Sequence, residues 1–372
     1  MAELDPRAAP PLRPRRRASA ALEYPYAAPT PDGAVVEIAP GVLWARMPLP
    51  IALDHLNVWL LRGDTGWTVV DTGMCTETTR MLWERIVAEH LGGAPIEALV
   101  CTHYHYDHTG LASWFSERFD VPVYMSLAEF LMLRGMADEM AADGPPPAEL
   151  QRYLDRAGMP AERSQRLVEA LRSDPYMPPP LGQFRRLRAG DELTIGRRRW
   201  QVLIGEGHSP EHVCLYCAEE RLLIGGDQLL PRITSNVLVT GFEPEANPIG
   251  LFFASLDRLD RCAADTLVLP AHQSAFRGLH ARTQELREHH RHQFEVLRRY
   301  VAEQGEATAF QAMRALFPHL RQASEDILAL GETVAHLNAL RAEGSLQRRL
   351  GAGGVWRYTP APLREEQPEV HW

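Results

Sequence analysis

Short apolar runs recur along the chain, and several end on a polar residue that can bind a metal or carry a proton. Runs this short, without helical spacing, are typical of buried strands. They lie at residues 69–70, 98–102, 200–204, 222–226 and 267–270. Period-two alternation at 193–195 is compatible with one more strand, and 196–199 looks like a hairpin turn. The pattern therefore predicts strands that carry polar side chains at their ends.

Helical spacing of apolar residues follows the strand at 98–102. Helices are predicted at 131–140, 147–157 and 160–172, within an insert of about 127–182, and Pro147 suits the first turn of the second helix. We expect this insert to form part of a roof over the functional site. Its apolar residues either line a substrate pocket or only pack the insert onto the core: Phe130, Leu131, Leu133, Met136 and Met140.

A change of character follows residue 272. A long charged helix is predicted at 282–303, and its three histidines point in different directions, which disfavours a shared metal. Three short helices at 307–317, 325–330 and 333–341 come next, and two strands at 346–349 and 355–358 surround a glycine-rich turn.

Composition narrows the class of protein. The chain has 372 residues, of which 45% are hydrophobic, enough for one or two domains. Its formal net charge of −9 argues against a general nucleic-acid binder. No apolar run reaches the ~18 residues of a membrane span. Residues 1–30 lack the apolar core of an export signal, so we expect a disordered arm and a cytoplasmic protein.

Five cysteines are too few for a disulfide framework in a chain of this size. Cys214 and Cys217 have the spacing of a metal or redox pair. They fall in a predicted strand, where residues three apart face opposite sides. We therefore expect no joint role for them.

The most informative segment is His103-Tyr104-His105-Tyr106-Asp107-His108, directly after the strand at 98–102. Imidazole and carboxylate groups suit zinc, iron and other transition metals. In a loop, His103 and His105 can share one metal while Asp107 and His108 turn toward a second. Three later residues add to the set, each soon after an apolar run: His208, Asp227 and His272.

The HxHxDH pattern of residues 103–108 resembles that of the metallo-β-lactamase superfamily, and the resemblance covers roughly residues 33–280. It implies an α/β fold, a four-layer αββα sandwich with the site at one edge of its two sheets. It also implies two divalent cations, zinc or else iron or manganese. The first would be held by His103, His105 and His208, and the second by Asp107, His108 and His272, with Asp227 bridging both.

The same resemblance implies hydrolysis by a hydroxide shared between the metals, with Asp107 as the catalytic carboxylate of the ligand set. Asp71, at the end of the run 69–70, is expected to accept a hydrogen bond from a metal-bound histidine. His55, Tyr104 and His212 are candidate substrate-positioning residues. The alternatives are a surface or capping role for the two histidines and core packing for Tyr104.

The tail resembles the winged-helix segment found at the C-terminus of some hydrolases of this fold. The resemblance divides the chain into the arm at 1–30, a catalytic domain at 31–280 and a C-terminal domain at 281–372. A winged helix that binds DNA inserts its recognition helix into the major groove. The corresponding helix here, at 332–343, carries carboxylates at both ends, Glu332 and Glu343, which DNA phosphates would repel. We expect it to pack, to dimerise or to form a cleft wall.

The substrate is the least determined property. The leading hypothesis is a small acyl thioester of CoA or glutathione, because glyoxalase II-like enzymes share the ligand set. A lactone comes next, then RNA, since some relatives with such a tail resemble endoribonucleases. A β-lactam is disfavoured by the missing export signal, and His105 argues against flavodiiron oxygen reductases, which have a glutamate there. A persulfide dioxygenase using one iron and a non-enzymatic regulator are minor alternatives.

Two arginine clusters bear on this choice, at 185–188 and 197–199. Arginines suit the phosphates of CoA or RNA. Solvated charge in a hairpin turn is the simpler interpretation of the second cluster. Whether the arginines face the metal site distinguishes the two.

Overall fold

The computed structural model describes residues 22–140, 148–172, 176, 178–320 and 325–362. Most of the predicted N-terminal arm, residues 1–21, lies outside the described residues. The chain divides into two compact units, each built from three stretches. The first unit comprises Met1–Asp143, Asp174–Ser235 and Leu251–Leu286, and the second comprises Gly144–Ser173, Asn236–Gly250 and Arg287–Trp372.

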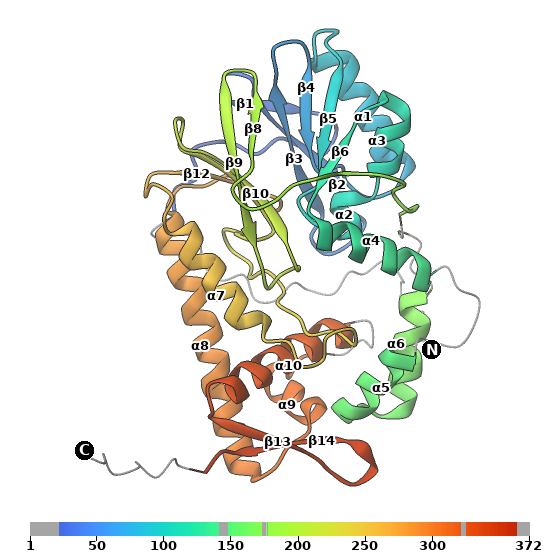
Figure 1. Cartoon of the computed structure of the whole chain (residues 1–372), viewed down its shortest axis with the longest axis vertical. Coiled ribbons are helices and arrows are strands. Elements are labelled where there is room, and N and C mark those ends of the chain that lie inside the picture. The colour runs from blue at the N-terminus through green and yellow to red at the C-terminus, as the bar shows by residue number, and fades with distance from the viewer. Residues whose placement is uncertain (1–21, 141–147, 173–175, 177, 321–324, 363–372) are drawn as a thin grey trace, which may run out of the picture. The chain divides into compact units, whose positions relative to one another are not determined.

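The first unit contains a seven-stranded sheet whose strand order follows the chain. Figure 1 labels its strands β1 to β6. Its first four strands are antiparallel neighbours, and the last four run parallel. The strands are β1 (Val35–Ala39), β2 (Val42–Pro48), β3 (His55–Arg62), β4 (Trp67–Val70), β5 (Ile96–Val100), β6 (Val123–Met125) and β7 (Arg185–Arg186).

A five-stranded sheet in the order β12-β11-β10-β9-β8 lies in the same unit. β11 and β12 are parallel, whereas the other neighbours are antiparallel. The strands are β8 (Glu192–Ile195), β9 (Arg198–Gly205), β10 (His212–Cys217), β11 (Leu222–Gly226) and β12 (Leu267–Pro270). The predicted hairpin at 196–199 is confirmed, because Ile195 pairs with Arg198.

One hydrophobic core joins the inner faces of the two sheets. Trp44 and Trp59 of the larger sheet stack with ring centroids 5.5 Å apart. Trp200, Val213 and Ile224 of the smaller sheet belong to the same cluster. Each large side chain buried in this way contributes roughly 1.5–3 kcal/mol, so the core holds the sheets face to face.

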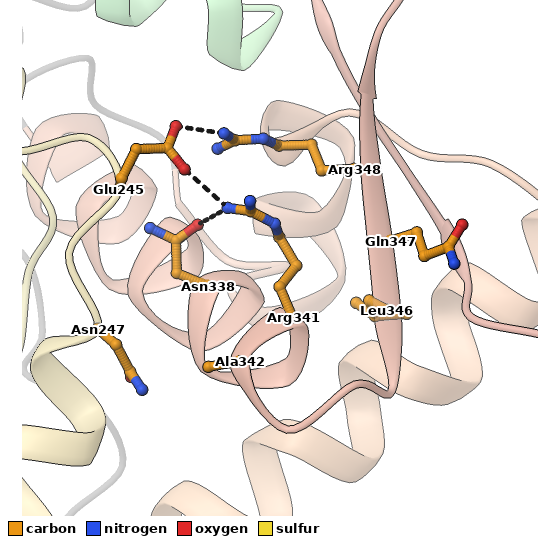
Figure 2. Close-up of a pocket in the computed structure, with 8 residues that line it drawn as sticks. All are labelled: Glu245, Asn247, Asn338, Arg341, Ala342, Leu346, Gln347 and Arg348. Atoms are coloured by element: carbon orange, nitrogen blue, oxygen red, sulfur yellow. Dashed lines mark hydrogen bonds and ion pairs between the residues drawn. The ribbon is translucent and has the colours of Figure 1, made fainter. Parts of the chain in front are cut away.

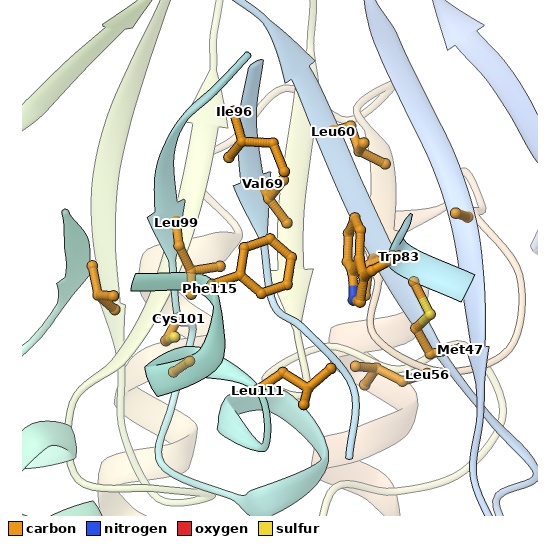
Figure 3. Close-up of a cluster of buried hydrophobic side chains, with 14 of the residues drawn as sticks. Met47, Leu56, Leu60, Val69, Trp83, Ile96, Leu99, Cys101, Leu111 and Phe115 are labelled. Atoms are coloured by element: carbon orange, nitrogen blue, oxygen red, sulfur yellow. The ribbon is translucent and has the colours of Figure 1, made fainter. Parts of the chain in front are cut away.

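A second core covers the outer face of the larger sheet (Figure 3). Helices α1 (Glu77–His90) and α3 (Ala112–Phe119) supply Trp83 and Phe115, which meet edge to face at 4.8 Å. The side chain of Thr76 accepts a hydrogen bond from Thr79 N and so caps the start of α1. The predicted mixed α/β sandwich is confirmed.

The remaining helices of the first unit connect these layers. They include α2 (Tyr106–Thr109) and α4 (Leu127–Met140), which starts before the predicted 131. Helices α7 (Pro248–Leu259) and α8 (Leu279–Gln304) are shared between the units. The long helix predicted at 282–303 is thus confirmed.

The second unit contains α5 (Ala148–Ala157) and α6 (Ala161–Arg172), close to their predicted bounds. It also contains α9 (Ala309–Leu316), α10 (Asp326–Ala342) and the hairpin of β13 (Leu346–Leu350) and β14 (Trp356–Pro360), with η2 (Ala352–Gly354) between the strands.

The prediction of separate helices at 325–330 and 333–341 was wrong, because α10 is continuous. Gly331 lies inside it, and a Cβ there would come within 2.9 Å of the carbonyl oxygen of Val239. The glycine therefore permits close packing of another segment rather than ending the helix.

Candidate metal centre

The candidate ligands gather at one edge because the strands before them end there. β4 and β5 are parallel, so Asp71 and His103 follow strand ends on the same side of the larger sheet. β11 and β12 are parallel as well, which brings Asp227 and His272 together. β9 runs antiparallel to β10, as β11 does, so the loop with His208 opens at this edge too.

The first group of ligands is His103, His105, His208 and Asp227, and their ligand atoms lie within 4.8 Å of one another. Nε2 of His103 is 2.8 Å from Nδ1 of His105 and 3.2 Å from Nε2 of His208. Nε2 of His208 is 3.4 Å from Oδ2 of Asp227. Three imidazoles and one carboxylate therefore face a common point.

The second group is Asp107, His108 and His272, again within 4.8 Å. Nε2 of His272 lies 3.5 Å from Oδ2 of Asp107, and Nε2 of His108 lies 3.6 Å from the same oxygen. Asp227 also reaches this group, 3.7 Å from His108 and 3.3 Å from His272. Asp227 therefore contacts both groups of ligands.

These separations fit metal ions. Ligand atoms about 2.0–2.1 Å from a tetrahedral zinc lie about 3.3 Å from each other. Several buried atoms also lack a hydrogen-bond partner among the described residues, namely Nε2 of His108, Nε2 of His272 and Oδ1 of Asp227. A buried polar atom without a partner is costly, and a metal ion would satisfy all three.

The electrostatics of the site also fit cations. Burial, followed by neighbouring imidazoles, holds the pKa of His103 well below its usual value, which favours the neutral ligand form. Burial also lowers the pKa of His108, but Asp107, Asp71 and Asp227 outweigh it and raise that pKa. The carboxylates of Asp71, Asp107 and Asp227 are buried close together, and positive charge beside them would offset the cost of their burial.

Contacts behind the ligands orient their rings. Nδ1 of His108 lies 2.8 Å from Oδ2 of Asp71, as predicted for a carboxylate that accepts from a ligand histidine. Nδ1 of His103 is 3.0 Å from the hydroxyl of Thr102, and Nδ1 of His272 is 2.8 Å from the carbonyl oxygen of His55. In each case the Nε2 atom is left to face the ligand group.

The three candidate substrate-positioning residues lie close to the ligands. His212 is buried, stacks on His103 at 4.8 Å and accepts a hydrogen bond from Asp227 N. His55 contacts Asp54 through Nδ1 and accepts from Gln273 N through Nε2. Tyr104 packs against the core of α1 and α3. Their contact with substrate stays a prediction.

Several apolar residues of α4 serve packing. Leu133 is buried in the core around Trp83. Phe130 stacks on Phe184 with centroids 4.1 Å apart, against the same core, and Leu131 is exposed. The side chain of Met140 lies outside the described residues. A pocket-lining role for Met136 stays a prediction.

The arginine cluster at 197–199 lies at the start of β9, an eight-residue strand roughly 23 Å long, and the loop with His208 follows the other end of this strand. It is also neutralised locally: Arg197 and Arg198 pair with Glu220, and Arg199 pairs with Glu219 and Glu192. This cluster is a set of hairpin ion pairs, not a phosphate site at the metal centre. Arg185 and Arg186 are exposed on the edge strand β7.

A pocket of about 410 Å³ lies in the second unit (Figure 2). All seven candidate ligands belong to the first unit. Its charged groups bind each other: Glu245 pairs with Arg341 and Arg348, and Arg341 also donates to Asn338. Asn338 donates to the carbonyl oxygens of Pro244 and Ala246. These contacts fasten the segment at 244–246 onto α10 and β13.

Sequence reasoning missed two residues of the site. Thr102 was assigned only to a strand, yet its hydroxyl contacts both His103 and Asp71. Glu129 is fully buried and bonds to the loops that carry the histidines. An acidic residue in the first turn of a helix is ordinary, so the local pattern carries no signal of its burial.

Across the described helices, none combines the length and the apolar character that crossing a membrane requires. The five cysteines have free thiols, and Cys214 and Cys217 are both buried on β10.

Comparisons with known proteins agree with this geometry. A family model described as Metallo-beta-lactamase superfamily matches residues 52–272, more than half of the chain. A second, Metallo-beta-lactamase-like, C-terminal domain, matches residues 296–361. The probable metallo-hydrolase YqjP of Bacillus subtilis (strain 168) is 28% identical over 309 residues, 82% of this chain and 93% of that protein.

A shorter match joins the chain to acyl-coenzyme A thioesterase MBLAC2 of Gallus gallus. It is 29% identical over 193 residues, covering 50% of this chain and 62% of the relative. Less than two thirds of that protein is therefore spanned.

Solved structures extend the likeness to nearly the whole fold. A beta-lactamase domain protein from Burkholderia ambifaria is 41% identical with a TM-score of 0.83, over 91% of this chain and 98% of that one. The metallo-beta-lactamase family protein TTHA1429 from Thermus thermophilus is 31% identical with a TM-score of 0.72, over 87% and 100%. Fold, ligand groups and relatives together place this chain in the metallo-β-lactamase superfamily, and its homologues are metallo-hydrolases.

Proposed function

We propose that this metallo-hydrolase cleaves acyl thioesters, with CoA thioesters as the substrate class, and that two zinc ions are its cofactors. The observation that carries the proposal is the position of Asp227, whose carboxylate contacts both groups of ligand histidines. A carboxylate placed between two groups suits a dinuclear centre, in which two cations share one bridging ligand.

Each ligand has a separate task in this proposal. His103, His105 and His208 hold the first metal as neutral imidazoles. Asp107 and His108, with His272, hold the second, and Asp107 adds negative charge on that side. Burial raises the pKa of Asp107, but His108 and His272 outweigh it and lower that pKa, which favours the ionised carboxylate. When bound, such a pair of divalent cations activates water and polarises a carbonyl oxygen.

The surrounding residues keep the ligands ready for this chemistry. The Asp71 carboxylate accepts a hydrogen bond from Nδ1 of His108, and the carbonyl oxygen of His55 accepts one from Nδ1 of His272. Such contacts remove rotational freedom from the rings before metal or substrate arrives. No serine or cysteine nucleophile is required, and the nearby Cys101 is buried in the core.

One comparison favours a thioester over a lactone or RNA. The MBLAC2 relatives are named as acyl-coenzyme A thioesterases. The arginines at 197–199, which suit the phosphates of CoA as well as those of RNA, are paired with glutamates and therefore favour neither substrate. Tyr104 and Tyr106, half-buried beside the ligands, offer apolar surface to an acyl group.

For the C-terminal domain at 281–372 we propose a packing role rather than DNA binding. Helix α10 is buried along most of its length, from Ala329 to Leu340. A helix that enters a DNA groove must expose one face, and Glu332 in α10 is buried too.

The test is hydrolysis of a panel of acyl-CoA and acyl-glutathione thioesters by protein of known metal content. Lactones and a structured RNA serve as the competing substrates. Turnover of thioesters well above lactones and RNA supports the proposal. Hydrolysis of lactones or RNA without hydrolysis of thioesters overturns the proposed substrate class, but it agrees with a metallo-hydrolase.

A further inference from the structure

Glu129 of α4 is a buried carboxylate outside both groups of metal ligands. Its Oε2 accepts a hydrogen bond from Tyr104 N at 3.0 Å. Its Oε1 accepts two more, from Ser209 Oγ at 2.6 Å and from Glu211 N at 2.7 Å. All four residues belong to the first unit.

The two ends of this carboxylate contact different ligand loops. Tyr104 stands between His103 and His105 in the sequence, and Ser209 directly follows His208. One side chain therefore ties together the loops that supply all three histidines of the first group. None of these three hydrogen bonds involves the second group of ligands.

The connection is reciprocal. The Glu211 carboxylate accepts a hydrogen bond from Ala128 N, at 3.0 Å, in the first turn of α4. The Glu129 carboxylate accepts one from Glu211 N in return. The start of α4 and the loop at 208–211 thus hold each other in register, as in a capping arrangement.

Burial of the Glu129 carboxylate costs folding free energy, because the charged group loses its contact with water. Burial raises the pKa of Glu129 to about 7 against three hydrogen bonds that lower it. An amide side chain would avoid that cost, but it would leave one of the three donors without an acceptor. A carboxylate has two acceptor oxygens and can therefore accept hydrogen bonds from all three donors of the two loops. An amide has only one acceptor oxygen.

We propose that Glu129 is a positioning residue that sets the separation of the two ligand loops, so that His103, His105 and His208 share one metal. The inference rests on the metal assignment of the proposed function. It adds a determinant of metal affinity that lies on α4, outside the ligand motifs.

Glu129→Gln separates this role from simple space filling. The amide oxygen can still accept from Ser209 Oγ and Glu211 N. The NH₂ group then faces Tyr104 N, so two donors oppose each other on the side of His103 and His105. Shape and volume are preserved while one of the two loops is released.

The experiment measures Zn²⁺ binding by chelator competition and the visible absorption of the Co²⁺-loaded protein. Wild type, Glu129→Gln, Ser209→Ala and the surface control Glu84→Gln are compared. We expect two ions in the wild type and the control. In Glu129→Gln the ion of the first group is bound roughly 10–100-fold more weakly with altered Co²⁺ bands, and the ion of the second group loses much less affinity. Ser209→Ala weakens the same ion to a smaller extent.

Wild-type affinity for both ions in Glu129→Gln overturns the inference, and so does an equal loss at both ions, because a general structural role predicts that. If Glu129→Gln does not fold, Ser209→Ala decides, and two unaltered ions in that variant overturn the inference. A wild type that binds no metal contradicts the proposed function itself, an outcome distinct from these.

Discussion

Oδ2 of Asp71 lies 2.8 Å from Nδ1 of His108, and both side chains are buried. Oδ1 of Asp71 accepts from Thr102 N and Oδ2 accepts from Thr102 Oγ1, so the carboxylate is fixed from two sides. The contact places the imidazole proton on Nδ1 and leaves Nε2 of His108 to face Asp107 and Asp227.

Asp71→Asn should therefore weaken the metal ion of the second group. The amide is neutral and cannot hold the Nδ1 proton as a carboxylate does, so we expect affinity to fall about 10–100-fold at that ion. Chelator competition measures the change, with the exposed Asp64→Asn as the matched control. Equal affinities in Asp71→Asn and wild type would show that the contact does not tune the metal.

Asp227 and Asp107 should differ in how many ions they affect. Asp227 contacts both groups, whereas Asp107 belongs to the second. Asp227→Ala should lower the occupancy of both ions, and Asp107→Ala that of one. Metal analysis after dialysis gives the stoichiometry, and circular dichroism verifies the fold. Loss of a single ion in Asp227→Ala would contradict its bridging position.

Removal of metal should destabilise the protein. A ligand that binds only the folded state at 100 times its dissociation constant stabilises by about 2.7 kcal/mol. We expect a chelator to lower the thermal midpoint and added Zn²⁺ to restore it. Calorimetry with Zn²⁺, Mn²⁺ and Fe²⁺ ranks the metals. An unchanged midpoint after complete metal removal would contradict a buried dinuclear site.

Glu129 should make the free energy of unfolding depend on pH. Folding raises its pKa from 4.5 to about 7, through burial and, to a smaller extent, the nearby Glu211 carboxylate. The folded state therefore binds the proton more tightly than the unfolded state. This contribution is complete below pH 4.5 and is lost as the pH rises through 7.

Relative to Glu129→Gln, the metal-free wild type should accordingly lose roughly 3 kcal/mol of unfolding free energy between about pH 4.5 and 8. Urea unfolding of both metal-free proteins across this range measures the difference. A difference that stays constant with pH would mean that Glu129 titrates normally.

The sequence predicted the candidate ligands because their signals are local. His103, His105, Asp107 and His108 fall in one loop, and His208, Asp227 and His272 each follow a short apolar run. Short apolar runs and periodicity also predicted β4, β5, β8, β9, β11 and β12, and helices α4, α5, α6 and α8. Strands β1, β2 and β6 and helices α1, α3 and α7 were not predicted.

The remaining features depend on partners distant in the chain. Glu129 acquires its surroundings from residues 104, 209 and 211. The helices predicted at 325–330 and 333–341 form one helix, α10, in which Gly331 allows the carbonyl oxygen of Val239 to approach closely. Local patterns cannot report such contacts, since tertiary packing overrides propensity.

The most direct test of the proposed dinuclear thioesterase is thiol release from acyl-CoA thioesters by protein with two bound metal ions, beside Asp227→Ala prepared in the same way. We predict metal-dependent release by the wild type and a loss of at least about 100-fold in kcat/KM for the variant, equivalent to ~2.7 kcal/mol of transition-state stabilisation. No release by fully metallated wild type, or equal rates for the two proteins, would contradict the proposed function.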